Sequence, residues 1–127
     1  MQFDPTVIVI DPDVAIGEAL TLLLYTYGIR TRTFVSAESF LEAWNEDKAK
    51  VASLLLVEAN LPGTSGLSLM RQLHEEYFNS PIIIMTNIAT AEIRQWAIKF
   101  GANDVIEKPF ISEFIVNRIV QLLSLEE

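Results

Sequence analysis

The sequence predicts an α/β protein in which a parallel β-sheet carries helices on both of its faces. Short apolar runs rich in β-branched residues alternate along the chain with longer segments whose apolar residues have helical spacing. Strands covered on both faces have such unbroken apolar runs, and crossover helices between parallel strands supply the alternation. The alternation occurs five times in 127 residues, a length that suits one domain with a substantial core.

The first four elements are each marked by a local signal. Residues 7–10 are β-branched throughout and predict the first strand. Residues 13–27 carry apolar side chains at helical spacing, and Gly28 is expected to end that helix. Residues 31–35 are rich in strand-forming side chains and predict the second strand. Ser36 follows at a position suited to cap the second helix.

The remaining elements continue the same alternation. Residues 54–57 predict the third strand and residues 66–77 the third helix. Residues 82–86 form another strand of the covered type, and Thr90 is expected to cap a helix that ends at Gly101. The last strand and the last helix are expected at residues 105–106 and 111–125.

The composition excludes several classes of function. The net charge is −8 with a pI near 4.6, so we expect no nucleic-acid partner and no anionic membrane partner, because both require a basic surface. The absence of cysteine excludes disulfides, thiolate metal sites and cysteine nucleophiles. No apolar run reaches transmembrane length, and no signal peptide is recognisable. We therefore expect a cytoplasmic domain.

Four polar residues end predicted strands or follow them directly: Asp11, Glu58, Thr86 and Lys108. The carboxyl ends of parallel strands meet at one edge of the sheet, so these side chains are expected to converge on one crevice. Two carboxylates, a hydroxyl and an ammonium suit phosphoryl chemistry, in which they hold a divalent metal and the phosphoryl group. The alternative is structural, because strand ends are polar in general and Lys108 can simply neutralise a carboxylate.

Five stretches form a specific set by their order and spacing: residues 7–11, 36–41, 61–67, 81–86 and 101–110. Through them the chain resembles the response-regulator receiver domains of two-component signalling along essentially its whole length. The resemblance implies a flavodoxin-like, doubly wound sheet of five parallel strands in the order 2-1-3-4-5 with five helices, as one domain over residues 1–127. It also implies a phosphorelay signalling role rather than an enzyme.

The positions that carry the family's chemistry depart from its pattern. The phosphoacceptor aspartate corresponds to Glu58, whose extra methylene moves the carboxylate out of the attack geometry. The second acid after strand one, a magnesium ligand in the family, corresponds to Pro12, which has no side-chain oxygen. Asp13 is expected to start the next helix rather than to replace that ligand. Val105 stands in place of the switch aromatic on strand five.

Thr86 and Lys108 match the family's switch threonine and phosphate-binding lysine. We therefore expect a pseudo-receiver in which Glu58 pairs with Lys108 and mimics what phosphate does in the family. Magnesium binding is expected to be weak or absent, with no other metal site and no catalytic residue. Three alternatives stay open: Glu58 is a relic without mimicry, an unusual receiver accepts phosphate from a histidine kinase through Asp11, Asp13 or Glu58, or the crevice binds a small ligand.

The last two predicted helices carry more apolar residues than the core requires. The surplus residues are Ile93, Trp96 and Phe100 on the fourth helix and Ile111, Phe114 and Val120 on the fifth. Similar receivers use the face of helix four, strand five and helix five to dimerise or to dock partners, so we expect a homodimer or a protein partner there. Ordinary core packing is the alternative, most of all for Ile93.

Overall fold

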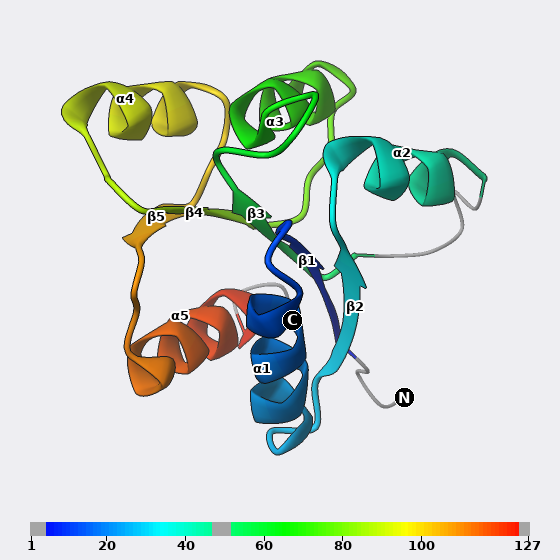
Figure 1. Ribbon diagram of the computed structural model, residues 1–127, viewed down its shortest axis with the longest axis vertical. Helices are drawn as coiled ribbons and strands as arrows, with labels where there is room; N and C mark the ends of the chain where they lie inside the picture. Colours follow the sequence, from blue (N-terminus) through cyan, green and yellow to red (C-terminus); the bar gives the residue numbers. More distant parts are fainter. Residues whose placement is uncertain (1–4, 47–51, 125–127) are drawn as a thin grey trace.

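A computed structural model describes residues 5–46 and 52–124, which form a parallel sheet flanked by helices (Figure 1). The strands are β1 (Thr6–Ile10), β2 (Arg30–Phe34), β3 (Leu54–Glu58), β4 (Ile82–Thr86) and β5 (Asp104–Glu107). They run parallel in the order β2-β1-β3-β4-β5. The predicted doubly wound topology is confirmed, and each strand lies within one residue of its predicted ends.

The helices that follow the strands are α1 (Val14–Tyr25), α2 (Ala37–Glu46), α3 (Gly66–Glu75), α4 (Ala91–Lys99) and α5 (Ser112–Ser124). Three of them, α1, α3 and α4, end two residues before the predicted positions 27, 77 and 101. The α3 exit turns at Tyr77, which has a φ of 62°, and the Phe78 N–H bonds back to the carbonyl of Leu73. Such a turn satisfies the last carbonyls without extending the helix. Residue 125, predicted in the last helix, lies outside the described residues.

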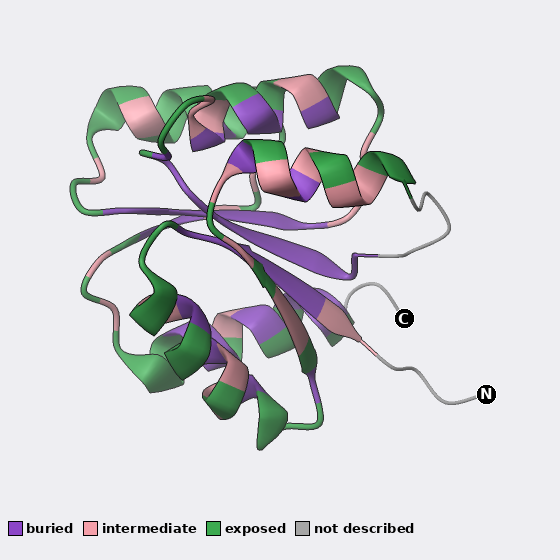
Figure 2. Ribbon diagram, turned by 45° about the vertical axis from the view of Figure 1, so that its right-hand side comes forward, coloured by how far each residue is buried: buried purple, intermediate pink, exposed green. Residues whose placement is uncertain are grey.

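Apolar layers cover both faces of the sheet (Figures 1 and 2). Helices α2, α3 and α4 pack on the face that carries Ile8 and Leu55, whereas α1 and α5 pack on the face that carries Val9 and Leu56. Strands β3 and β4 are buried along their whole length, while the edge strand β2 is partly exposed. No helix in the described parts of the chain is both long and apolar enough to span a membrane.

Side-chain caps hold the starts of the helices in place. Asp13 accepts a hydrogen bond from the N–H of Ala15 at 3.0 Å, and Thr90 accepts one from the N–H of Ile93 at 3.1 Å. Ser36 caps α2 in the same way. The predicted roles of Asp13, Ser36 and Thr90 as helix caps are confirmed, and each satisfies one of the unpaired N–H groups of a first helical turn.

Candidate functional site

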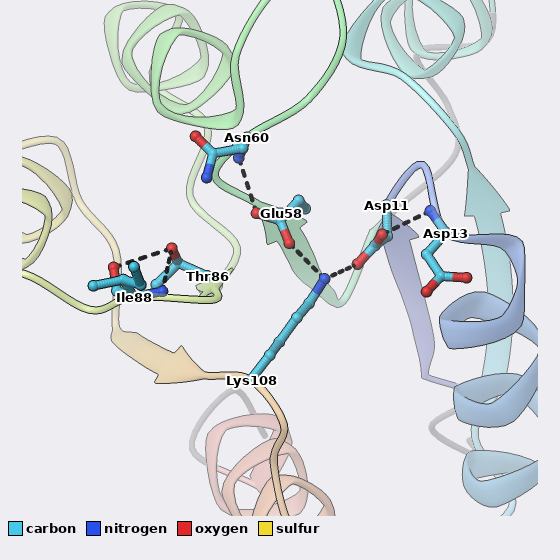
Figure 3. Close-up of polar contacts among 7 residues, drawn as sticks. All are labelled: Asp11, Asp13, Glu58, Asn60, Thr86, Ile88 and Lys108. Atoms are coloured by element: carbon cyan, nitrogen blue, oxygen red, sulfur yellow. Dashed lines mark hydrogen bonds and ion pairs between the residues drawn. The ribbon is translucent and has the colours of Figure 1, made fainter.

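Three charged side chains meet at the carboxyl edge of the sheet (Figure 3). Asp11 follows β1, Glu58 ends β3 and Lys108 follows β5. The Lys108 Nζ donates hydrogen bonds to Asp11 Oδ2 at 2.6 Å and to Glu58 Oε1 at 2.5 Å. Because β1 and β3 are neighbours, the two carboxylates lie side by side, and the lysine reaches them across the end of β4. The ion pair expected between Glu58 and Lys108 is therefore present, and Asp11 shares it.

The hydrogen-bonding capacity of this cluster is largely used. The side chains of Asp11, Glu58 and Lys108 are only 1%, 5% and 13% exposed. Asp11 Oδ1 accepts the N–H of Asp13 at 2.8 Å, and Glu58 Oε2 accepts the N–H of Asn60 at 2.9 Å. Each of the four carboxylate oxygens therefore accepts a hydrogen bond, as buried charges require. The sequence had suggested no role for the N–H of Asn60 in holding Glu58.

The charge of Lys108 is stabilised within the cluster. Burial of this side chain opposes its charge, but the hydrogen bonds and the negative charges of Asp11 and Glu58 outweigh that cost. Together they raise the pKa of the Lys108 ammonium above its usual value of 10.5. One ammonium between two carboxylates leaves the cluster with an excess of negative charge.

The connection between β3 and α3 presses closely on Glu58. A Cβ atom on Gly66 would lie 2.0 Å from the carbonyl oxygen of Glu58, so only glycine fits at the start of α3. The Glu38 carboxylate holds the same connection by accepting the N–H of Thr64 at 2.9 Å. The hydrogen bonds from Thr64 lower the pKa of Glu38. In the sequence, the glycine at the start of the helix was the one available sign of this close packing. The contact between Glu38 and Thr64 joins residues 26 positions apart, so no local pattern indicated it.

The two switch positions do not join the cluster. The Thr86 hydroxyl donates to the carbonyl of Ile88 at 3.2 Å and accepts its N–H at 3.3 Å, so it is turned away from Lys108 (Figure 3). The expected convergence of four strand-end groups therefore holds for Asp11, Glu58 and Lys108 but not for Thr86. The reason is local, because the turn after β4 satisfies this hydroxyl. Val105 is 8% exposed and packs in the core beneath α4.

A crevice of about 520 Å³ opens beside the cluster. Its lining residues are Asp11, Pro12, Asp13, Ile16, Glu58, Asn60, Asn87, Lys108, Pro109 and Phe110. Thr86 is not among them, and the Lys108–Pro109 peptide bond at its rim is cis.

These residues do not fit a divalent metal ion. The Asp11 oxygens are held by Lys108 and by the backbone, Pro12 has no side-chain oxygen, and the Asp13 carboxylate caps α1. Within residues 5–46 and 52–124 no group of three or more acidic or histidine side chains is arranged to hold a metal. Magnesium requires several oxygen ligands in octahedral geometry. The donor set at this edge of the sheet does not supply them.

The apolar residues expected on one face of α4 divide between two sides. Trp96 donates its Nε1–H to the carbonyl of Leu67 at 3.5 Å, and its ring lies 4.8 Å from that of Phe100. Phe100 in turn contacts His74 at 5.9 Å between ring centroids. Both aromatic side chains therefore pack toward α3, and the expectation that they face β5 and α5 is wrong. The rotation of α4 follows from its packing on the core through Ala97 and against α3, and such tertiary contacts cannot be read from the helix's own sequence.

Ile93 follows the structural alternative rather than the interface hypothesis. It is partly buried and packs against the core below α4. Ile98 was not selected from the sequence, yet it is 72% exposed. It lies one helical turn after Arg94, whose Nη1 reaches the carbonyl of Val105 on β5 at 3.5 Å. Residues four apart share a helix face, so Ile98 lies on the β5 side of α4.

Ile111 and Phe114 lie at the start of α5 with exposures of 73% and 55%. Arg118, four residues after Phe114, bonds through Nε to the carboxylate of Asp104 on β5 at 2.7 Å. Because residues four apart share a helix face, this ion pair indicates that Phe114 also lies on the side of α5 next to β5. Val120 is 39% exposed and lies on another side of the helix. The exposed apolar residues beside β5 are thus Ile98, Ile111 and Phe114.

The fold and the site define a class of protein: doubly wound α/β domains whose acidic and lysine side chains meet at the ends of β1, β3 and β5. A family model described as the response regulator receiver domain matches residues 7–120. The chain belongs to this family, whose members act in two-component phosphorelay signalling. The resemblance of the sequence to receiver domains is thereby confirmed, together with the flavodoxin-like fold.

Two transcriptional regulatory proteins are similar in sequence and support the assignment to the receiver family. The chain is 31% identical over 94% of its length to the transcriptional regulatory protein TdiR of Thauera aromatica and covers 52% of that protein. It is 33% identical over 85% of its length to the transcriptional regulatory protein FixJ of Azorhizobium caulinodans and covers 50% of it. The chain thus spans about half the length of these curated relatives.

A solved structure shows the same architecture. The response regulator receiver protein from Burkholderia phymatum superposes with a TM-score of 0.84 at 27% identity, covering 94% of this chain and 95% of that chain.

Proposed function

We propose that this receiver domain signals through protein contacts and that its pocket is held in one state without phosphate. The observation that carries the proposal is the bridge from Lys108 to both Asp11 and Glu58. The lysine that binds phosphoryl oxygens in the family is already paired here, and the side chain in the acceptor position is its partner. The ion pair therefore occupies the place of the phosphoryl group and its counter-charge.

Several features of the pocket oppose phosphorylation. The extra methylene of Glu58 displaces the nucleophile from the in-line position, and displacements of this order have large effects on rate. Pro12 removes a metal ligand, so the charge of a phosphoryl donor is not neutralised beside Asp11. The excess negative charge of the cluster repels the donor further. We propose that magnesium binds weakly or not at all and that the domain catalyses no reaction.

The partner is proposed to be a second copy of the chain or another protein, bound on the face formed by α4, β5 and α5. The exposed apolar side chains of Ile98, Ile111 and Phe114 support this, since exposed apolar patches are typical of interfaces. A net charge of −8 disfavours nucleic acid as the partner of this domain. The absence of cysteine is in keeping with a cytoplasmic location.

The test is to treat the domain with acetyl phosphate and magnesium and to record its intact mass. We expect no phosphoryl adduct on the wild-type chain. Beryllofluoride with magnesium is likewise expected to leave the tryptophan fluorescence unchanged. The matched control is the double variant Pro12→Asp/Glu58→Asp, which restores both the metal ligand and the acceptor and is expected to gain one phosphoryl group.

A wild-type adduct on Glu58, Asp11 or Asp13 would show that the domain is an unusual but competent receiver. If only the double variant gained an adduct, Pro12 and Glu58 would be the cause of the lost phosphorylation. If neither protein were labelled while a competent receiver in the same reaction was, the cause would lie outside these two positions and the proposed explanation would be wrong.

A further inference from the structure

A second pocket lies at the open edge of the sheet, beside β2 and away from the Asp11–Lys108–Glu58 cluster. Its volume is about 570 Å³, within the range of roughly 300–1,000 Å³ that is usual for small-molecule sites. Strand β2 runs between α1 on one side and α2 on the other (Figure 1). In the described part of the chain β2 pairs only with β1, so its outer edge is open.

Aromatic rings form the apolar wall of this pocket. Trp44 and Phe40 on α2 are stacked, with centroids 5.8 Å apart and planes inclined by 25°. Phe34 at the end of β2 meets Phe40 edge to face at 5.7 Å. All three line the pocket. Flat aromatic surfaces of this kind favour a planar, apolar ligand.

A guanidinium group lies in the same lining. The Cζ of Arg32 is 5.2 Å from the ring centroid of Phe34, which holds the group by a cation–π contact. No carboxylate pairs with Arg32 among residues 5–46 and 52–124. The planar Arg32 guanidinium has the bidentate geometry that matches a carboxylate.

The pocket also contains a buried hydroxyl without a partner. Thr31 Oγ1 is buried and makes no hydrogen bond with the residues that the structure describes. Such groups are rare in folded proteins. Thr31 and Arg32 are consecutive in β2, so their side chains lie on opposite faces of the strand. Both line the pocket because it wraps around this edge strand.

The backbone of β2 adds polar groups to the same edge. The N–H of Arg30 donates to the carbonyl of Pro5 just before β1, and the carbonyl of Phe34 accepts the N–H of Asp11 just after β1. In a parallel ladder alternate residues bond to opposite sides, so the N–H and carbonyl of Thr31 are directed to the open edge. The pocket thus combines an aromatic wall, two arginines and several polar groups along a single strand.

We propose that this pocket binds a small planar aromatic carboxylate. The ring of the ligand lies against Trp44, and its carboxylate pairs with Arg32, which lies on the same face of β2. This inference is independent of the proposed function, because no residue of the Asp11–Lys108–Glu58 cluster takes part. The domain would then respond to a metabolite through the β2 edge rather than to phosphate through the strand ends.

The test uses naphthalene-2-carboxylate as the probe and isotope-labelled protein observed by NMR. The chain has two tryptophans, Trp44 in the pocket and Trp96 against α3. We expect the probe to shift the indole N–H signal of Trp44 and to leave that of Trp96 unchanged. The uncharged naphthalene-2-carboxamide is expected to bind at least tenfold more weakly, because it cannot pair with Arg32.

Substitutions separate this site from general apolar binding. Arg32→Gln is expected to weaken binding of the carboxylate at least tenfold, and Ala43→Leu, which fills the pocket, is expected to abolish the Trp44 shift. The control Arg71→Gln removes an arginine on α3 and is expected to leave binding unchanged. The proposal is wrong if the carboxylate gives no Trp44 shift at millimolar concentration, if the carboxamide binds equally well, or if a folded Arg32→Gln protein binds as the wild type does. If either variant fails to fold, the difference in affinity between the carboxylate and the carboxamide for the wild-type protein still tests the proposal.

Discussion

Lys108 shares one ammonium group between two buried carboxylates, and this sharing makes the three residues energetically inseparable. Asp11 and Glu58 are 1% and 5% exposed at their side chains, so either carboxylate left unpaired would be a buried, uncompensated charge. Such pairs contribute little net stability compared with apolar residues, but losing one partner is strongly destabilising. The cluster therefore fixes the geometry of the pocket more than it stabilises the fold.

Replacing Lys108 by methionine tests this dependence. The substitution keeps most of the side-chain volume but leaves Asp11 and Glu58 facing each other without a counter-charge. We expect the free energy of unfolding to fall by about 3 kcal/mol, measured by urea denaturation at neutral pH. The control Lys99→Met removes an exposed lysine that lies over the Phe100 ring and is expected to cost no more than about 0.5–1 kcal/mol. Equal effects of the two substitutions would contradict the central role of Lys108.

The raised pKa of Lys108 makes stability depend on alkaline pH. A group whose pKa is higher in the folded than in the unfolded state contributes its full stabilisation below the unfolded value, here 10.5. That contribution is lost as the pH rises through the folded pKa. We expect the stability difference between the wild type and Lys108→Met to be constant at pH values below 10.5 and to shrink as the pH rises above that value. Urea denaturation of both proteins below and above this pH measures it, and a difference that stays constant throughout would exclude the linkage.

At the scale of elements, the start of α3 shows how backbone packing positions the acid. Gly66 lies where a Cβ would come within 2.0 Å of the Glu58 carbonyl oxygen, and its N–H bonds to the carbonyl of Ala59 at 2.9 Å. The helix can therefore begin directly against the end of β3 only if this position has no side chain. The close approach restricts the turn that carries Glu58 and Asn60.

The substitution Gly66→Ala is expected to be strongly destabilising. The obstructing atom belongs to the backbone and cannot rotate away, so α3 or the end of β3 must shift. We expect a loss of about 3 kcal/mol in the free energy of unfolding, the upper end for overpacking. Ser68→Ala on the exposed side of the same helix is the control, and its effect is expected to stay within about 0.5 kcal/mol. If Gly66→Ala left the free energy of unfolding nearly unchanged, the contact between α3 and the end of β3 would not be as close as described.

The elements themselves were predictable, while their orientations were not. Strands with unbroken apolar runs and helices with caps at Asp13, Ser36 and Thr90 are marked by neighbouring residues, and they appear where expected. The rotation of α4 is different, since Trp96 turns toward α3 instead of β5. A helix with more apolar residues than one face requires can be buried in more than one rotation about its axis, and its packing partners determine which rotation it adopts.

For the molecule as a whole, the exposed apolar residues beside β5 are the feature that suggests assembly. Ile98 and Ile111 are 72% and 73% exposed, and Phe114 is 55% exposed. They belong to helices on opposite faces of the sheet, so only the complete fold brings them to one side. An interface there would bury apolar area that the isolated domain leaves in water.

The association state tests this surface. We expect the wild-type domain to show twice the chain mass of 14.3 kDa by light scattering, and Phe114→Glu and Ile98→Glu to return it to the mass of a monomer. Burying an unpaired carboxylate in an apolar interface is costly, which is the reason for the expected effect. Leu22→Glu, at a residue 72% exposed on α1, is the matched control and is expected to leave the dimer intact. A monomeric wild type would rule out the homodimer.

The sequence by itself determined the alternation of strands and helices, the parallel sheet, the membership of the receiver family, and the presence of Glu58 and Pro12 in the pocket. These properties depend on local periodicity and on residue identity at known spacings. Only the tertiary structure decided that Lys108 bridges Asp11 and Glu58, that Thr86 bonds to its own turn, and that Arg32 and Trp44 share a pocket. Those contacts join residues from different elements, and their geometry follows from how strands, helices and turns pack against one another, which no local pattern encodes.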